Sequence, residues 1–359
     1  MDWMEELRRA ANESLPGWLA HYIECGAMAG VSAAGASAAW DRLRLRPRVL
    51  VDVAAVSTST TVLGQEVSSP LAVAPTALHR ALHPEGELAT ATAAAEAGAL
   101  FCLSARSGMR MEKIAATGVR WWMQVYVLRD RDVTEAYVRR AAAAGAGALV
   151  LTADTPVLGR KPGADALAEQ AGVDLPAAYS AANVTPVGED PETYWNSESV
   201  RDLYQAPDLT PAAIGWLAEL SGLPVVVKGV LRADDARRCV DGGAAAIWVS
   251  NHGGRQLDGA VSTADALPEV VAALDGTGAE VYVDGGIRRG SHALRALALG
   301  ARMVFLGRPP LWGLACAGAD GVRQVLDGLT DELAHAMTLS GAPTPAHLTP
   351  DLVAPEPAG

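Results

Sequence analysis

The sequence predicts a (β/α)8 barrel, the TIM barrel fold class, with an N-terminal helical cap and a long insertion after the fourth strand. The first observation behind this prediction is a series of eight short apolar runs that alternate with stretches of helical spacing. Each run is continuously apolar rather than alternating, as expected for parallel strands that helices cover on both faces. The second observation is the count itself. Eight alternating units fit a closed barrel better than a doubly wound sheet, which usually has fewer strands.

The eight expected strands follow one another from the second fifth of the chain onward. They lie at 71–74, 100–103, 121–125, 148–151, 224–227, 246–249, 280–283 and 303–306. The segments between them begin with acidic or small residues and end with glycine, which is typical of helix boundaries. Examples are 85–98, 132–145, 233–242 and 291–300.

Residues 1–70 precede the first strand and do not continue the alternation. They contain helical stretches at 3–12 and 17–29 and strand-like stretches at 48–53 and 59–63. We expect this part to cap one end of the barrel.

The regular spacing breaks once, between the fourth and fifth runs. Residues 159–208 contain Pro, Gly, Asp, Asn and Ser without sustained periodicity. An insertion after a barrel strand lies at the catalytic end, so we expect a lid, with a disordered surface loop as the alternative. A length of 359 residues would also allow two domains, but the eight strand ends favour one barrel domain over 1–359.

Composition excludes several classes of protein. Half of the residues are apolar and only 19% are charged, which excludes a disordered chain and a coiled coil. The net charge of −12 makes nucleic acid an unfavourable partner. The chain shows no signal peptide and no apolar stretch long enough to span a membrane, so we expect a cytoplasmic protein without a membrane partner. Four widely spaced cysteines show no metal-binding pattern, and we expect no metal.

Residues that directly follow barrel strands line the active site of this fold. In this sequence every strand ends in residues that can hydrogen-bond or carry charge. They are Pro75, Thr76, Ser104, Arg106, Gln124, Tyr126, Thr152, Asp154, Lys228, Ser250, His252, Arg255, Asp284, Arg288, Gly307 and Arg308. Taken alone, Lys228 could be a solvated strand tip and Asp154 a helix cap. Polar or charged residues at the same place after all eight strands favour a functional site.

The last two strand ends carry a phosphate-binding pattern. Gly285, Gly286 and Arg288 follow the seventh strand, and Gly307 and Arg308 follow the eighth. Barrels often hold a phosphate at this place, where glycine amides allow close approach and arginine offers a bidentate contact. The pattern does not distinguish a nucleotide, a flavin and a sugar phosphate. Neither a P-loop nor a Rossmann glycine motif is present.

Residues 250–258, with the sequence SNHGGRQLD, closely resemble the signature of the FMN-dependent L-2-hydroxy acid oxidases and dehydrogenases. That family includes glycolate oxidase, lactate oxidase and mandelate dehydrogenase. Further segments resemble the family in its order, over about residues 15–341. They are APTA at 74–77, HPEGE at 83–87, QVY at 124–126, LTADTP at 151–156, VKGV at 227–230 and the stretch 284–308.

The resemblance implies that FMN binds at the mouth of the barrel. Lys228 would lie beside N1 and O2 of the flavin, where a cation stabilises the reduced, anionic ring. The other residues would contact the ring, the ribityl chain or the phosphate. They are Pro75, Thr76, Ala77, Ser104, Gln124 and Thr152 at the ring, Ser250 near the ribityl chain, and Asp284, Gly285, Gly286, Arg288, Gly307 and Arg308 at the ribityl hydroxyls and phosphate.

The resemblance also implies the chemistry. His252 would take a proton from the 2-hydroxy acid, and Asp154 would stabilise the resulting imidazolium. Arg255 would hold the substrate carboxylate. Tyr22, Tyr126 and Arg160 would complete the substrate site, and the product would be a 2-oxo acid.

The electron acceptor is left open at this point. Oxygen as acceptor would make an oxidase that releases H2O2, whereas a quinone or carrier protein would make a dehydrogenase. A barrel that binds a phosphorylated ligand without redox chemistry is the alternative from another class. The family also implies a homotetramer.

One residue departs from the family at the substrate site. Arg106 lies where the family has an aromatic or small residue. A cation there favours a substrate with a second anionic or strongly polar group. The competing interpretation is that Arg106 turns to solvent or pairs with a carboxylate of the insertion.

Overall fold

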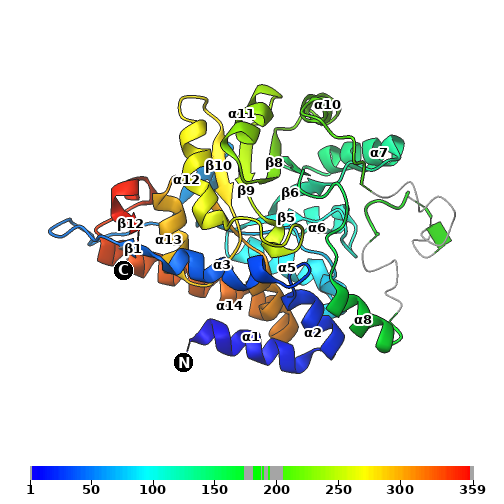
Figure 1. Cartoon of the computed structure of the whole chain (residues 1–359), viewed down its shortest axis with the longest axis horizontal. Coiled ribbons are helices and arrows are strands. Elements are labelled where there is room, and N and C mark those ends of the chain that lie inside the picture. The colour runs from blue at the N-terminus through cyan, green and yellow to red at the C-terminus, as the bar shows by residue number, and fades with distance from the viewer. Residues whose placement is uncertain (1, 174–180, 187, 190–192, 195–204, 356–359) are drawn as a thin grey trace.

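The computed structural model describes residues 2–173, 181–186, 188–189, 193–194 and 205–355. Eight parallel strands close into a barrel in the order β10-β11-β4-β5-β6-β7-β8-β9, which confirms the predicted fold class. Helices surround the barrel on its outside (Figure 1). The strands are β4 (Leu71–Val73), β5 (Leu100–Leu103), β6 (Arg120–Val125), β7 (Leu149–Thr152), β8 (Val225–Val230), β9 (Ala246–Val249), β10 (Glu280–Val283) and β11 (Met303–Leu306).

The apolar strands are buried on both faces, which is why their sequences do not alternate. Their outward side chains pack against the surrounding helices in one large core. These helices are α4 (His79–Leu82), α5 (Gly86–Glu96), α6 (Met111–Ala115), α7 (Arg131–Ala143), α10 (Ala212–Ser221), α11 (Ala233–Asp241), α12 (Thr263–Ala273), α13 (Gly290–Ala298) and α14 (Arg308–Ser340).

Inward side chains form a second, smaller core inside the barrel. Four large aromatic residues lie there on different strands, and the remaining strands contribute smaller apolar side chains. The aromatic residues are Trp122, Trp248, Tyr282 and Phe305. The hairpin β2 (Thr60–Val62) and β3 (Gln65–Val67) closes the amino-terminal end of the barrel with Val62 and Val67.

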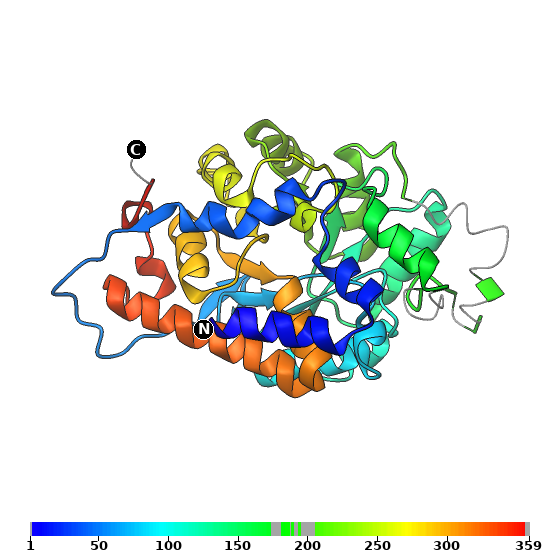
Figure 2. The ribbon, with the colours of Figure 1, turned by 60° about the horizontal axis from the view of Figure 1, so that its bottom comes forward.

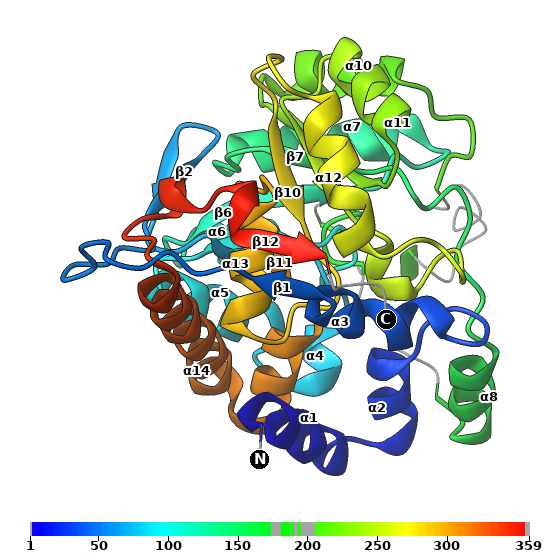
Figure 3. The ribbon, with the colours of Figure 1, turned by 60° about the vertical axis from the view of Figure 1, so that its left-hand side comes forward.

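The N-terminal part forms three helices that run along the barrel: α1 (Trp3–Ser14), α2 (Gly17–Glu24) and α3 (Val31–Asp41). Helix α1 lies beside α14 (Figure 2). Strand β1 (Leu43–Leu45) pairs antiparallel with β12 (Val353–Pro355) near the end of the chain (Figure 3). Neither α3 nor this strand pair was expected from the sequence.

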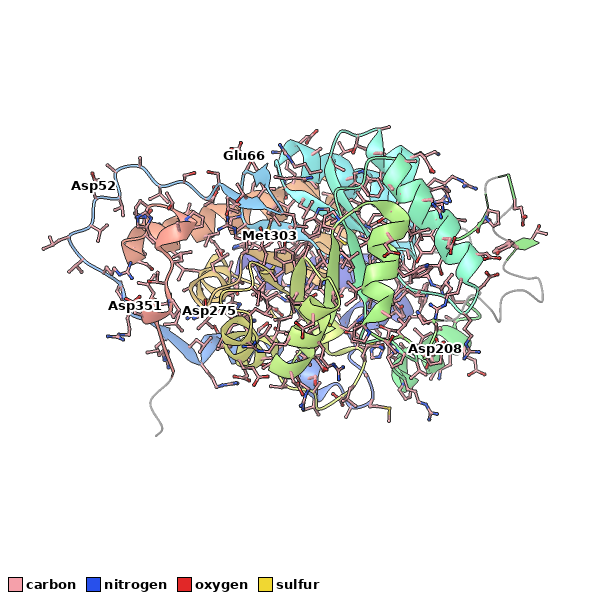
Figure 4. All side chains as sticks on the ribbon, turned by 90° about the horizontal axis from the view of Figure 1, so that it is seen from above. Asp52, Glu66, Asp208, Asp275, Met303 and Asp351 are labelled. Atoms are coloured by element: carbon pink, nitrogen blue, oxygen red, sulfur yellow. The ribbon has the colours of Figure 1, made fainter. Side chains whose placement is uncertain are left out.

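Two expectations for the N-terminal part differ from the structure. The helix expected at 17–29 ends at Glu24. The strand expected at 48–53 is an exposed loop, because no neighbouring strand pairs with it; Figure 4 shows Asp52 on this projecting loop. The insertion contains helix α8 (Pro162–Gln170), while residues 174–180, 187, 190–192 and 195–204 of it lie outside the described residues. Short 3-10 turns occur at His252–Gly254, Pro345–His347 and Pro350–Leu352.

A buried glutamate holds the loop that follows β5. The Oε1 atom of Glu87 accepts a hydrogen bond of 3.1 Å from the Gly108 amide, and its Oε2 atom has no partner among the described residues. The side chain is 0% exposed. Burial raises the pKa of Glu87 to about 7.

The first prediction concerns a close backbone crossing within α14. A Cβ atom at Gly321 would lie 2.0 Å from the Gly313 carbonyl oxygen, so we expect Gly321→Ala to lower the free energy of unfolding by about 1–3 kcal/mol. The control is Gly35→Ala in α3, where a Cβ meets nothing within 4 Å. Removing a helical glycine there should stabilise the protein by about 0.5–1 kcal/mol. Urea denaturation measures the free energy of unfolding of both variants, and equal changes in the two would contradict the close backbone contact at Gly321.

The second prediction concerns the pH dependence that Glu87 imposes. Its pKa is raised from 4.5 to about 7, so between these values the folded protein holds a proton that the unfolded chain has lost. The contribution of Glu87 to the free energy of unfolding therefore falls as pH rises, by about 3 kcal/mol in all. Relative to Glu87→Gln, the wild type should lose this stability between pH 4.5 and pH 8. Parallel pH profiles of the two proteins in urea denaturation would contradict this.

Candidate active site

A cavity of about 500 Å³ opens at the carboxyl ends of the barrel strands. Most of the residues expected at the site line it together, although they come from all parts of the chain. They are Tyr22, Pro75, Thr76, Ala77, Ser104, Arg106, Tyr126, Lys228, His252, Arg255, Asp284, Gly285, Gly286, Arg288, Gly307 and Arg308. Its volume is in the range typical of ligand-binding pockets.

A buried lysine lies at the floor of this cavity. Lys228 Nζ donates a hydrogen bond of 2.8 Å to Ser250 Oγ and lies 3.3 Å from Asp284 Oδ2. Burial alone would lower the pKa of Lys228, but the carboxylates of Asp284 and Asp154 outweigh it and hold the pKa above its ordinary value. Lys228 is therefore a permanent positive charge at the base of the site.

Other buried polar residues form a layer behind the cavity wall. Gln124 Nε2 donates to Thr152 Oγ1 at 2.9 Å, and Gln124 Oε1 accepts from the Ala105 amide at 2.9 Å. On the other side, His79 lies between Thr76 Oγ1 at 2.7 Å and Thr90 Oγ1 at 2.9 Å. Burial lowers the pKa of His79 to about 3, so this imidazole is neutral and serves to orient Thr76.

His252 and Asp154 form a pair at the cavity edge. His252 Nδ1 lies 3.0 Å from Asp154 Oδ1. Burial alone would raise the pKa of Asp154, but His252 and Lys228 more than offset this, so its pKa lies below the ordinary value. An ionised Asp154 accepts the Nδ1 proton, which leaves Nε2 of a neutral imidazole as a proton acceptor. Gly229 allows this arrangement, because a Cβ there would lie 2.6 Å from the Asp154 side chain.

Arg255 is fixed by the end of helix α2. Its Nη1 donates to the carbonyl oxygens of Tyr22 at 2.7 Å and Cys25 at 2.9 Å, and its guanidinium lies 4.7 Å from the centre of the Tyr22 ring. The last carbonyl oxygens of a helix have no hydrogen-bond donor within the helix, and Arg255 supplies one here. Tyr126 lines the same region. Burial and the nearby Asp154 raise the pKa of Tyr126, which therefore stays protonated.

Two arginines meet at the other end of the cavity. Arg308 Nε donates to the Ile23 carbonyl at 2.9 Å, and the Arg288 guanidinium lies 4.8 Å from the centre of the Trp312 ring. Burial, followed by the charge of Arg308, lowers the pKa of Arg288 to about 9. The mutual repulsion of Arg288 and Arg308 favours the binding of a multiply charged anion at this end of the cavity. Arg308 also opens helix α14, whose N-terminus favours anions.

The residues present fit FMN. The arginine pair suits its phosphate, and a Cβ at Gly307 would meet nothing within 4 Å, so the backbone there is open to a ligand. Asp284 Oδ1 is buried without a hydrogen-bond partner among the described residues, and a ribityl hydroxyl would supply one. Lys228 would face the ring.

The expected substrate contact of Arg160 is not supported by its position. Arg160 is exposed, does not line the cavity, and accepts a hydrogen bond from Met28 through its carbonyl oxygen. Its neighbour Lys161 lines the cavity instead and donates a hydrogen bond of 2.7 Å to the Gly159 carbonyl. Burial, and then the charge of Arg255, lowers the pKa of Lys161. Adjacent cations in a segment without periodicity cannot be told apart by pattern, so the sequence alone does not point to Lys161.

Other features of the described residues bear on ligands and location. No group of three metal-ligating side chains occurs within the part of the chain that the structure describes. None of the described helices combines the length and the apolar character that crossing a bilayer requires. All four cysteines are free thiols.

Comparison with known proteins gives consistent matches along the chain. Residues 11–355 match the family described as FMN-dependent dehydrogenase. An L-lactate oxidase of Nostoc is 48% identical, covering 85% of this chain and 84% of that protein. A 4-hydroxymandelate oxidase of Amycolatopsis orientalis is 43% identical, covering 94% of each chain.

Solved structures of mandelate oxidase match the fold as well. One is 42% identical with a TM-score of 0.86, covering 96% of this chain and 95% of that chain. Another of these structures contains an FMN adduct. The family resemblance and the FMN cofactor expected from the sequence are thereby confirmed. The chain belongs to the family of FMN-dependent dehydrogenases.

Proposed function

We propose that this protein oxidises a small L-2-hydroxy acid to the 2-oxo acid, with O2 as the electron acceptor and H2O2 as the second product. The observation that carries the proposal is the His252–Asp154 pair at the cavity edge, 3.0 Å apart, beside a half-buried Arg255. The relatives with matching chains are named for the oxidation of lactate, 4-hydroxymandelate and 2-hydroxyacids, which supports this class of substrate.

The residues of this chain divide the reaction between them. Arg255, with Lys161 nearby, binds the substrate carboxylate, and Tyr22 and Tyr126 donate hydrogen bonds to substrate oxygens. His252 Nε2 accepts the hydroxyl proton, and Asp154 stabilises the imidazolium that forms. FMN supplies the acceptor for the two electrons and the Cα hydrogen. Lys228 provides a positive charge where the flavin ring becomes electron-rich.

The third prediction tests this function directly. Purified protein loaded with FMN should be yellow, and its flavin absorbance should bleach when a 2-hydroxy acid is added without oxygen, then recover in air with release of H2O2. His252→Gln should keep the colour and slow bleaching about 10²- to 10⁴-fold, because it removes the proton acceptor.

The outcomes separate the alternatives. Recovery only with a quinone or carrier protein would make the protein a dehydrogenase. FMN-loaded protein that no 2-hydroxy acid bleaches would contradict the proposed oxidation and favour a binding barrel without redox chemistry. The substrate panel contains glycolate, lactate, mandelates and 2-hydroxydicarboxylates.

The fourth prediction distinguishes two neighbouring cations. Lys161→Met should raise KM about tenfold or more, because a charge-assisted contact to the substrate carboxylate is lost. Arg160→Met is the matched control and should change KM by less than about twofold, because Arg160 lies outside the cavity. Steady-state kinetics on one substrate checks both, and the reverse order of effects would refute this assignment.

The fifth prediction concerns the substrate side chain. Arg106 lines the cavity and follows β5, so we propose that it interacts with a second anionic or strongly polar group of the substrate. Arg106→Gln should then lower kcat/KM about tenfold for a 2-hydroxydicarboxylate but leave glycolate nearly unaffected, and Arg106→Lys should retain most of the preference. Equal losses on both substrates would contradict the proposed interaction.

Three further expectations belong to this proposal. Lys161 and Gln205, from the two ends of the insertion, line the cavity, which supports a lid role for residues 159–208. The N-terminal part, 1–70, is proposed as a cap within a single barrel domain. A homotetramer in the cytoplasm is also proposed: the exposed apolar side chains of Val49 and Leu50 and the four free thiols support it, and sedimentation equilibrium measures the assembly. Some relatives, however, are named as peroxisomal enzymes.

A further inference from the structure

The interior of the barrel below the cavity contains a column of four aromatic side chains, of which Trp248, Trp122 and Tyr282 are oxidisable. Phe305 lines the floor of the cavity, and Trp248 stacks on it with ring centres 3.6 Å apart. Trp122 lies 6.0 Å from Phe305, and Tyr282 lies 5.5 Å from Trp122 and 5.9 Å from Phe305. All four side chains are at most 1% exposed. The column thus leads from the cofactor cavity toward the amino-terminal end of the strands.

The far end of the column has a proton acceptor. Tyr282 donates a hydrogen bond of 2.8 Å from its hydroxyl to Glu280 Oε2. The other carboxylate oxygen, Oε1, accepts from the Leu63 amide at 3.1 Å, in the hairpin that closes the barrel. A phenol that loses an electron also loses its proton readily, and here an acceptor is already in place.

The two indoles in the middle have no such acceptor. Nε1 of Trp122 and Nε1 of Trp248 are both buried without a hydrogen-bond partner among the described residues. Each unsatisfied donor of this kind costs about 1–3 kcal/mol, and a phenylalanine would fill much of the same space without that cost. Packing alone therefore does not account for tryptophan at both positions.

The near end of the column lies within reach of the flavin. Lys228 Nζ is 5.5 Å from the centre of the Trp248 ring, and Lys228 also lines the cavity. Trp248 is separated from the cavity by no more than the Phe305 ring on which it stacks. An indole at this depth is well placed to exchange an electron with a ring system bound above it.

We propose that Trp248, Trp122 and Tyr282 form an internal electron-donor chain that reduces the bound FMN by one electron when the flavin absorbs light. The excited flavin takes one electron from Trp248, and Tyr282 then refills the vacancy, either through Trp122 or across the Phe305 ring that all three side chains contact. Tyr282 passes its hydroxyl proton to Glu280 as it is oxidised, so charge and protons balance within the barrel. The indoles retain their protons because they have no acceptor, so they only relay the electron.

Transient absorption of the FMN-loaded protein after a short blue pulse, without substrate or oxygen, tests the chain. In the wild type, the excited flavin should decay rapidly into a state that carries the absorption of oxidised tryptophan. Trp248→Phe should lengthen the flavin excited-state lifetime several-fold and abolish the tryptophan signal. Trp121→Phe is the matched control, since Trp121 belongs to the outer core, and it should change neither observable.

Two further variants keep the test decisive if Trp248→Phe fails to fold or to bind FMN. Tyr282→Phe should leave the first electron transfer fast but accelerate its reversal, because the vacancy can no longer reach Glu280. Trp122→Phe should show the same effect to a smaller extent, because the route across Phe305 remains. A wild-type lifetime in Trp248→Phe, or wild-type reversal in both other variants, would overturn the proposal. Quenching that disappears only in Tyr22→Phe or Tyr126→Phe would overturn it as well. Bleaching of FMN by a 2-hydroxy acid is measured separately, so either result leaves the proposed function to its own test.

Discussion

The site depends on one buried charge, the ammonium of Lys228 at the top of the barrel interior. It is held by Ser250 and Asp284 on the two following strands and is influenced by Asp154 on the preceding one. Burying an unpaired ammonium would cost several kcal/mol, so the carboxylates are needed to keep it charged. Asp154 in turn orients His252. One cation therefore connects the proposed flavin position with the proposed catalytic pair.

The barrel interior divides into two layers at this lysine. Above it, the strand ends present polar and charged groups to the cavity, and below it the interior is apolar and aromatic. The N-terminal part completes the upper layer from outside, because the final carbonyls of α2 bind both Arg255 and Arg308. The proposed substrate end and the proposed phosphate end of the cavity are thus held by the same helix terminus, which links their geometry.

Much of this arrangement follows from the sequence, for identifiable reasons. Strands buried on both faces leave continuous apolar runs, so all eight were found, and the closed topology then brings their polar ends together. The incorrect or missing secondary-structure predictions fall where the structure depends on tertiary contacts that a local sequence pattern does not show. Val49 and Leu50 look like part of a strand but have no neighbour to pair with, and helix α3 consists of small residues with little periodicity. Arg160 and Lys161 are adjacent cations, and the fold of the insertion decides which of them lines the cavity. The sequence also does not show which aromatic residues of different strands contact one another inside the barrel.

The most direct test of this account is the reduction potential of bound FMN, measured by equilibration with reference dyes in the wild type and in Lys228→Met. A positive charge beside the ring stabilises its reduced, electron-rich form, so the variant should bind FMN and show a lower potential. An unchanged or higher potential in a folded, FMN-loaded Lys228→Met protein would contradict the central place given to this lysine.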